Sequence, residues 1–304
     1  MSISKDLFGH CNYKEITDNI CSFISGYVER SQANGIMIGI SGGLDSAVLA
    51  FLGLKALGPG KTNGIFLPDR DTAIESYRHA EIVAAAAGIK LETRELTPTL
   101  TEMGCYKNII VRFAKNGMIN RNGFKAFRRI MNKDLYEFNL KGSKNRVIKQ
   151  AMESYYLRYR TRMKTLYKES RKLGLVLPDS LNKTENKMGF TTYEDITVDC
   201  APLLSLYKSQ VRGLAEHLGV PLDIIKKPPS PDLFPGITDE TFLDISYPQL
   251  DSILYLLEKG YSKQIIAYEN GINVKKVKRI EHLVILASQL NSKLDLQCPI
   301  IECD

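Results

Sequence analysis

The 304-residue sequence lacks the marks of a membrane or secreted protein. No apolar run approaches the roughly 20 residues that a membrane-spanning helix needs, and the first ten residues contain no apolar signal-peptide core. Six cysteines show no C-x-x-C spacing and four histidines lie far apart, which argues against a zinc site and a disulfide scaffold. Cys298 and Cys303 could pair, but free thiols are the favoured interpretation. We therefore expect a cytoplasmic protein without a membrane segment.

Acidic residues are scarce between residues 106 and 172, where 19 lysines and arginines stand against four aspartates and glutamates. Since the whole chain carries a formal charge of +7, the remainder is net acidic. A charge run is usually a solvated helix face, but this one could also be an anion-facing surface for nucleotide phosphates or nucleic acid. Within it, the weakly patterned and glycine-interrupted segment 103–149 indicates a basic insertion or lid.

What the sequence does contain is an alternation of strand and helix patterns. Strand patterns occur at 36–41, 63–67, 90–96 and 174–178, and helix patterns at 13–33, 45–57, 71–87, 150–173 and 205–218. This order predicts an α/β fold with a doubly wound, mostly parallel sheet and helices on both faces. Four prolines between 228 and 240 predict a loop. We expect one domain over 1–304, with a C-terminal helical part at 249–304.

The segment Gly39–Ser46 (GISGGLDS) joins the first predicted strand to the next helix. A glycine turn at a helix N-terminus cradles anions, because backbone N–H groups and the helix dipole point at the ligand. The pattern is not the Walker motif, which needs a lysine after its second glycine. It resembles the PP-loop of the ATP pyrophosphatases, which cleave ATP to AMP and pyrophosphate. A plain glycine turn is the simpler alternative, disfavoured because Ser41, Asp45 and Ser46 match along with both glycines.

A collinear series of motifs downstream distinguishes among the PP-loop families. It comprises Arg160-Thr161-Arg162-Met163, Asn182-Lys183-Thr184-Glu185, Gly189-Phe190, Asp195, Asp199, Leu206–Val211, Lys227–Leu233, Thr238-Asp239-Glu240 and Ser246-Tyr247. Over roughly 35–98 and 150–288 the chain resembles the ammonia-dependent NAD synthetase family. The resemblance implies an adenine nucleotide alpha hydrolase-like fold, a homodimer, and amidation of deamido-NAD with ammonia. We expect no glutaminase domain, so free ammonia or an ammonia-supplying partner would provide the nitrogen.

The resemblance also implies roles for individual residues. ATP would be bound by Gly39, Ser41, Gly42, Gly43, Asp45, Ser46, Ser180, Lys208 and Ser230, of which Asp45, Ser46 and Lys208 would be catalytic. Asp45 and Glu185 would ligate Mg²⁺, which prefers carboxylate oxygens. The acceptor would meet Arg160, Arg162, Asp195 and Asp199. Plainer interpretations remain open: Asp45 as an ordinary acidic residue at a helix N-terminus, and Glu185 and Lys208 as solvated surface groups.

Departures from the family pattern concentrate on the acceptor side. The family's motif asparagine is replaced by Tyr156, its paired glycines by Ile196-Thr197, its lysine falls near Thr192, and its C-terminal His-Lys-Arg becomes Leu290-Asn291-Ser292. On the ATP side, Ser180 and Ser230 stand for threonines and keep the hydroxyl. Because Ile and Thr exclude the close approach that glycine permits, we infer that adenylation is preserved and the acceptor pocket is altered.

Three functions therefore compete at this stage. The first is an ammonia-dependent NAD synthetase, and the second is the same chemistry on another carboxylate, such as a sugar acid or natural-product acid. The third is a tRNA-modifying or nucleic-acid-binding protein, favoured by the basic segment and by 262–286, which could form a helix-turn-helix. Thr238-Asp239-Glu240 and Ser246-Tyr247 argue against the third, because tRNA-modifying relatives would lack them. We therefore expect small-molecule partners rather than nucleic acid.

Overall fold

A computed structural model describes residues 11–108, 111, 135–142, 145–190, 198–230, 238–291 and 296–301. Its centre is a three-stranded parallel sheet in the order β1 (Ile36–Gly39), β2 (Thr62–Phe66) and β3 (Lys90–Thr93). Ile36 is in register with Thr62, and Asn63 with Lys90. The strand predicted at 174–178 forms only single parallel bridges, Ile36 to Val176 and Pro178 to Cys200.

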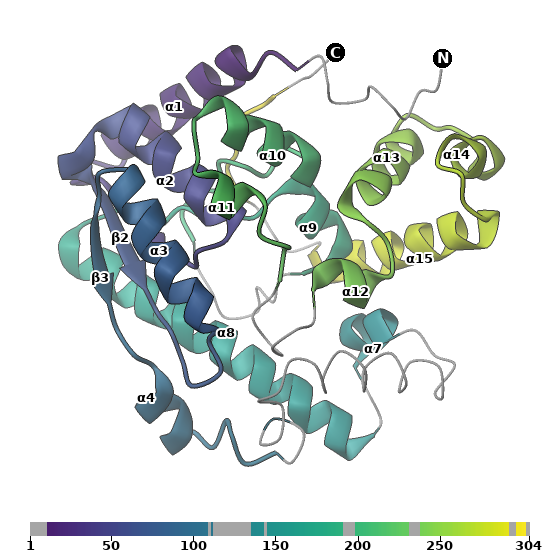
Figure 1. Ribbon diagram of the computed structural model, residues 1–304, viewed down its shortest axis with the longest axis horizontal. Helices are drawn as coiled ribbons and strands as arrows, with labels where there is room; N and C mark the ends of the chain where they lie inside the picture. Colours follow the sequence, from purple (N-terminus) through teal and green to yellow (C-terminus); the bar gives the residue numbers. More distant parts are fainter. Residues whose placement is uncertain are drawn as a thin grey trace.

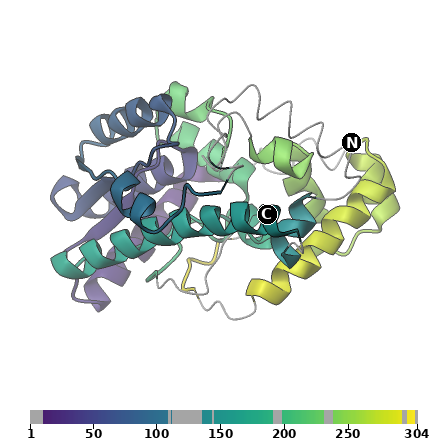
Figure 2. The same cartoon turned by 90° about the horizontal axis from the view of Figure 1, so that it is seen from below.

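Helices cover both faces of this sheet, as the alternating pattern predicts (Figures 1 and 2). On one face lie α1 (Tyr13–Arg30) and α2 (Leu44–Leu57), and α3 (Ile74–Ala86) packs beside them. On the other face runs the long α8 (Arg146–Leu173). Side chains of a strand alternate between faces, so Ile36 and Ile38 join the core with α1 and α2, whereas Met37 joins Leu166 of α8.

A helical layer completes the molecule beyond the carboxyl ends of the strands. It contains α9 (Lys183–Met188), α12 (Asp239–Leu243), α13 (Tyr247–Glu258), α14 (Lys263–Glu269) and α15 (Val274–Asn291). The helices α10 (Lys208–His217) and α11 (Leu222–Ile225) pack instead against α2. Figure 1 shows α12–α15 grouped on the side of the molecule opposite β3. The shorter α4 (Thr97–Glu102), α7 (Leu135–Lys141) and the 3₁₀ turn η1 (Pro59–Lys61) connect these parts.

The predicted helix-turn-helix at 262–286 is a packing layer. Ile266 of α14 and Val277 and Ile280 of α15 are fully buried in one apolar cluster with α13. Tyr136 of α7 enters the same cluster and donates a hydrogen bond to the carbonyl of Met188 at 2.7 Å. Most of the predicted basic insertion at 103–149 lies outside the described residues; its described end, α7 and the start of α8, packs against the C-terminal helices through α7.

Several predicted boundaries are corrected by local hydrogen bonding. The helix predicted over 71–87 begins at Ile74, because residues 69–72 form a turn. The backbone amide of Asp69 donates to the hydroxyl of Thr72, and the backbone amide of Thr72 donates to the carbonyl of Asp69, both at 2.9 Å. The strand predicted to reach residue 96 ends at Thr93. The loop predicted over 228–240 ends where α12 begins at Asp239.

The C-terminal part is not helical throughout. After α15, residues 296–301 form neither helix nor strand and contact the α/β part, where the amide of Ala201 donates to the carbonyl of Gln297 at 2.9 Å. Among the described cysteines, Cys11, Cys21, Cys105, Cys200 and Cys298 are free thiols, and Cys303 lies outside the described residues. Within the described ranges, every helix is too short or too polar to cross a membrane.

Candidate active site

A cavity of about 880 Å³ lies where the carboxyl ends of β1 and β2 meet the helical layer. Its walls come from the loop after β1, the middle of α8, the segment 177–185, the start of α10, residues 227–230 and the start of α13. Ligands of open α/β sheets bind at this edge. Of the ATP-binding residues predicted from the sequence, the cavity is lined by Gly39, Ser41, Gly43, Asp45, Ser46, Ser180, Lys208 and Ser230.

The loop after β1 is closed by its own hydroxyl groups. The Ser41 and Ser46 hydroxyls lie 3.1 Å apart, and Ser46 donates to the carbonyl of Gly43 at 3.1 Å. The amide of Gly43 in turn donates to the Ser41 hydroxyl at 3.2 Å. Since α2 begins at the next residue, Leu44, its unpaired N-terminal amides face the cavity, which is the arrangement that binds phosphate.

Gly42 shapes this turn without lining the cavity. It has a φ of +71°, a region that residues with a Cβ rarely adopt, and a Cβ built on it would lie 2.8 Å from the carbonyl oxygen of Ser76 and 2.9 Å from the Cβ of His79. Both neighbours belong to α3. The loop can therefore pack this closely on α3 only with glycine at position 42.

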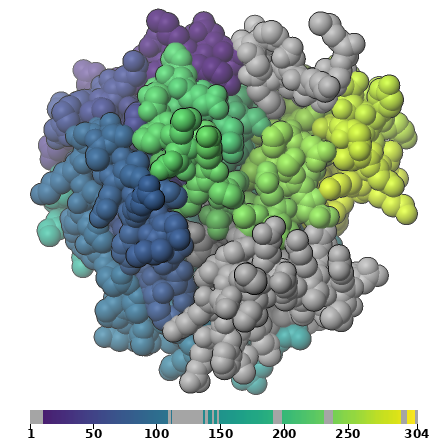
Figure 3. All heavy atoms as spheres, in the orientation of Figure 1, coloured from purple at the N-terminus to yellow at the C-terminus, as the bar shows by residue number. Residues whose placement is uncertain are grey.

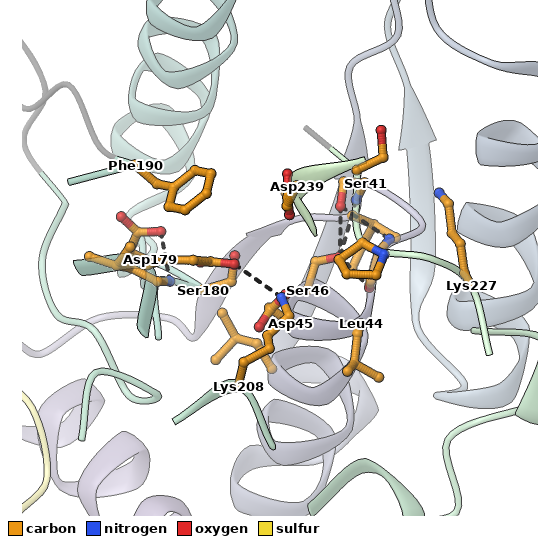
Figure 4. A pocket seen from close by; sticks show the side chains of 18 of the residues that line it. Ser41, Leu44, Asp45, Ser46, Asp179, Ser180, Phe190, Lys208, Lys227 and Asp239 are labelled. Carbon is orange, nitrogen blue, oxygen red and sulfur yellow. Dashed lines mark hydrogen bonds and ion pairs between the residues drawn. The ribbon is translucent and has the colours of Figure 1, made fainter. Parts of the chain in front are cut away.

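Two carboxylates and one ammonium form the charged centre of the cavity. Figure 4 shows two of the three groups, Asp45 and Lys208, facing each other. The Lys208 ammonium donates to Asp45 Oδ2 and, at 3.0 Å, to Glu185 Oε1. Burial alone lowers the pKa of Lys208, but Asp45 and Glu185 outweigh it and hold the pKa above its ordinary value. Burial raises the pKa of Glu185, against the effect of Lys208. Lys208 and Glu185 are therefore not solvated surface groups. Asp45 does lie in the first turn of α2, and its role toward a ligand stays a prediction.

Asn182 contacts the Asp45 carboxylate and caps the helix that carries Glu185, a role that we did not predict. Its side-chain amide donates to Asp45 Oδ1 at 2.8 Å, and its oxygen accepts from the amide of Glu185 at 3.0 Å as the N-cap of α9. Asn is among the preferred N-cap residues, and the order Asn182-Lys183-Thr184-Glu185 contains a capping signal. That signal indicates the helix start, but the contact with Asp45 depends on the tertiary fold.

Asp251 of α13 fixes the backbone beside Lys208. It accepts hydrogen bonds from the hydroxyl of Thr184 at 2.5 Å and from the amide and hydroxyl of Ser209 at 2.7 and 2.6 Å. The Thr184 hydroxyl also accepts from the amide of Lys208 at 2.9 Å. A single fully buried carboxylate thus joins α9, α10 and α13 behind the charged centre.

Asp251→Asn is expected to change how stability depends on pH. Burial raises the pKa of Asp251 from 3.8 to about 6, against the opposing hydrogen bonds. The folded state therefore binds this proton more tightly, so its contribution to the free energy of unfolding is complete at acidic pH and is lost as the pH rises through about 6. Urea unfolding of both proteins should give a stability difference that falls across this range. A difference independent of pH would contradict the prediction.

A further acidic group faces the cavity from α12. Asp239 is buried and accepts a hydrogen bond from the Tyr247 hydroxyl at 3.0 Å, while the amide of Tyr247 donates to Glu240 at 2.8 Å. The Lys208 ammonium lies 5.3 Å from the centre of the Tyr247 ring. The motifs Thr238-Asp239-Glu240 and Ser246-Tyr247 therefore form one wall, although the sequence analysis assigned no role to these side chains.

The predicted acceptor residues are divided between the cavity wall and other places. Arg162 lines the cavity and donates to Asp69 at 2.6 Å, whereas Arg160 is not among the described residues that line it. Asp199 lies outside the wall, where it accepts from the amide of Leu177 at 2.7 Å and from Arg171 at 2.5 Å. Asp195 lies outside the described residues. Roles of these residues toward an acceptor stay predictions.

Arg158, one turn before Arg162 on α8, is buried. Its exposed fraction is 3%, and it donates to Asp71 at 2.9 Å and lies 3.6 Å from Asp69. Because Arg158 and Arg162 are four residues apart on α8, both reach the turn after β2. Asp69 is not among the residues that line the cavity, but it holds Arg162 from a position three residues after the end of β2, where the carboxyl edge of the sheet was the signal available.

A parallel sheet that presents this loop and this charged centre at its carboxyl edge defines an α/β nucleotide-binding protein of the adenine nucleotide alpha hydrolase-like fold. The chain matches the family model for NAD synthase over residues 16–148 and 128–292. The chain belongs to the NAD synthase family.

Individual relatives agree with this assignment. The chain is 35% identical over 265 residues to the NH(3)-dependent NAD(+) synthetase of Thermotoga neapolitana, covering 86% of this chain and 90% of that protein. It is 34% identical over 272 residues to the enzyme of that name from Methanocaldococcus jannaschii, covering 89% of this chain and 92% of the relative.

Solved structures show the same fold. The NMN synthetase of Francisella tularensis superposes with a TM-score of 0.67 at 24% identity, over 94% of this chain and 98% of that one. The NH3-dependent NAD synthetase of Campylobacter jejuni superposes with a TM-score of 0.64 at 21% identity, over 96% and 99% of the two chains. The predicted α/β fold and family are therefore confirmed.

Proposed function

We propose that the protein is an ammonia-dependent NAD synthetase, which converts deamido-NAD to NAD and ATP to AMP and pyrophosphate. The observation that carries the proposal is that the PP-loop and the Asp45–Lys208–Glu185 cluster line one cavity. Family membership and relatives of that name at 34–35% identity over most of the chain support the same activity.

The reaction has two steps, because a carboxylate is a poor electrophile toward an amine. In the first, a carboxylate oxygen of the acceptor attacks the α-phosphorus of ATP, the bond to the bridging oxygen breaks, and pyrophosphate leaves. In the second, ammonia attacks the carbonyl of the mixed anhydride, AMP leaves with the oxygen that formed the anhydride, and the nitrogen loses one proton to solvent. Preorganised donors at the PP-loop and the Lys208 ammonium stabilise the charge that develops on the phosphates.

The residues of the charged centre fit Mg²⁺. Asp45 of α2 and Glu185 of α9 both place a carboxylate oxygen on the Lys208 ammonium, so the two carboxylates lie close together. Mg²⁺ is usually bound by one or two protein carboxylates together with substrate phosphates and water. We assign these two side chains as the protein's ligands. When bound, Mg²⁺ would neutralise charge on the phosphates. In this account, Ser41, Gly43, Ser46, Ser180 and Ser230 hold the nucleotide.

On the acceptor side, Arg162 is the predicted residue that lines the cavity, held by Asp69. We propose that it meets the acceptor or its adenylate, while Arg160, Asp195 and Asp199 keep the roles that the family resemblance implies. By that resemblance we also propose a homodimer, which light scattering of the purified chain tests directly.

Purified protein supplied with ATP, Mg²⁺, ammonium and deamido-NAD is expected to form NAD, AMP and pyrophosphate in equal amounts. Replacing ammonium by glutamine is the control, and should leave the rate near background. Absence of NAD and AMP would contradict the proposed function. AMP formation only with a different carboxylic acid would instead identify the alternative acceptor that departures such as Ile196-Thr197 led us to consider.

A further inference from the structure

The cations that line the cavity differ in what neutralises them. Within the described part of the chain they are Arg162, Lys208, Arg212 and Lys227. Arg162 donates to the carboxylate of Asp69, and Lys208 donates to two carboxylates. Both side chains are therefore already paired with negative charge, whereas a nucleotide triphosphate brings several further negative charges into the cavity.

Lys227 is placed differently. Its ammonium lies 3.3 Å from the carbonyl oxygen of Gly42 and 3.2 Å from the hydroxyl of Ser76, and among the described residues it contacts no carboxylate. Both acceptors are neutral, and an ammonium group has three N–H donors. Lys227 is half-buried, so its charge lies against the PP-loop rather than in open solvent.

The backbone around Lys227 is held by its neighbours. Ile224 and Ile225 of α11 are buried in the core, and Figure 3 shows the green residues of this region against the blue residues of α3. Pro228 and Pro229 restrict the backbone that follows, and the carbonyl of Pro229 accepts from the amide of Asp239 at 3.0 Å. The lysine is therefore positioned by packed elements on both sides, unlike a mobile surface lysine.

In Figure 4, Lys227 and Lys208 lie on opposite sides of Ser41 and Leu44. In Walker-type loops a lysine inside the loop reaches the terminal phosphates, but residues 39–46 of this chain contain no lysine. We propose that Lys227 supplies this charge from outside the loop and binds the pyrophosphate end of ATP on the side away from Lys208. This proposal rests on the proposed function and adds a residue to its ATP site.

The chemical role follows from where charge develops. As the acceptor oxygen bonds to the α-phosphorus, the bond from that phosphorus to the bridging oxygen breaks and its electron pair passes to the departing pyrophosphate. An ammonium beside that group stabilises the new charge without giving up a proton. Burial, Lys227 and Arg78 lower the pKa of the neighbouring His79, so this histidine is a weak competitor for the same anion.

The test is binding of pyrophosphate and of AMP, each with Mg²⁺, by titration calorimetry. Lys227→Gln keeps an amide donor for Gly42 and Ser76 but removes the charge, and we expect pyrophosphate binding to weaken by about tenfold to a hundredfold while AMP binding is unchanged. Lys227→Arg should retain most of the pyrophosphate affinity. Lys226→Gln, at the exposed neighbouring position, is the matched control and should change neither affinity.

Wild-type-like pyrophosphate binding by Lys227→Gln would overturn the proposal, and so would a wild type that binds no pyrophosphate. Equal weakening of pyrophosphate and AMP binding would overturn it as well, because that result marks a purely structural contact. These results are separate from the proposed function. A wild type that forms no NAD, but whose pyrophosphate affinity falls on loss of the Lys227 charge, would refute the function and retain the residue's assignment.

Discussion

Asp45→Asn is expected to lower the rate of pyrophosphate release by about 10³-fold, the upper end of what loss of one electrostatic contact with a transition state costs. Asp45 is the residue of α2 that contacts both Lys208 and Asn182, and we assign it as a Mg²⁺ ligand. The substitution keeps the shape of the side chain and removes its charge. The rate of pyrophosphate release, measured in quenched time points at several Mg²⁺ concentrations, tests the prediction.

Asp18→Asn on the exposed face of α1 is the matched control, because it removes a carboxylate from a surface pair with Lys14 and should leave the rate unchanged. Asp45→Asn should remain folded, since Lys208 keeps its contact with Glu185. Unchanged turnover in the folded Asp45→Asn protein would remove this residue from the metal site and leave Glu185 without a partner ligand.

Gly42→Ala should combine backbone strain with a collision against α3. The φ of +71° costs a residue with a Cβ about 1–2 kcal/mol, and overpacking against the Ser76 carbonyl and His79 adds roughly 1–3 kcal/mol. Because the loop must move to relieve the contact, we expect kcat/KM for ATP to fall by about 100-fold, together with a lower free energy of unfolding. Steady-state kinetics and urea unfolding measure both effects.

Gly88→Ala separates strain from collision. Gly88 has a φ of +59°, but a Cβ there meets nothing within 4 Å, and it lies after α3, at the end opposite the PP-loop. Gly88→Ala should lower the free energy of unfolding only by the backbone strain, about 1–2 kcal/mol. Its kcat/KM for ATP should stay unchanged. Equal kinetic losses in the two variants would contradict a role for the contact between Gly42 and α3.

The sheet and the PP-loop were predictable because they are local. Apolar runs at 36–41 and 63–67 match β1 (Ile36–Gly39) and β2 (Thr62–Phe66) within two residues, since buried parallel strands are continuous apolar segments. The loop needs only eight consecutive residues to specify strand, turn and helix. Weaker patterns were overextended: the strand predicted at 174–178 forms only single bridges, to Ile36 of β1 and to Cys200, which belongs to no strand.

The charged centre was predictable in its members but not in its geometry. Asp45, Glu185 and Lys208 were identified through a family resemblance, whereas their convergence requires α2, α9 and α10 to meet across 163 residues of chain. The spacing of these residues along the sequence does not predict how close their side chains lie in the folded protein. The pairing of Asn182 with Asp45 was missed for the same reason.

Buried ion pairs were the least predictable part of the site. An aspartate in a turn is expected to be exposed, yet Asp69 is 2% exposed because Arg162 and Arg158 approach it from α8. Likewise, Lys227 was recognised only as part of a motif. A lysine beside two prolines gives no sign that its ammonium will reach the PP-loop, which depends on the packing of α11 against α3.

The central claim is that the PP-loop holds ATP so that a carboxylate oxygen captures its adenylyl group. Deamido-NAD labelled with ¹⁸O in the carboxylate tests this most directly, because the attacking oxygen must leave with the AMP. Mass spectrometry is predicted to find one ¹⁸O atom in each AMP formed and none in pyrophosphate. Unlabelled AMP, or formation of ADP with the label in inorganic phosphate, would contradict the account.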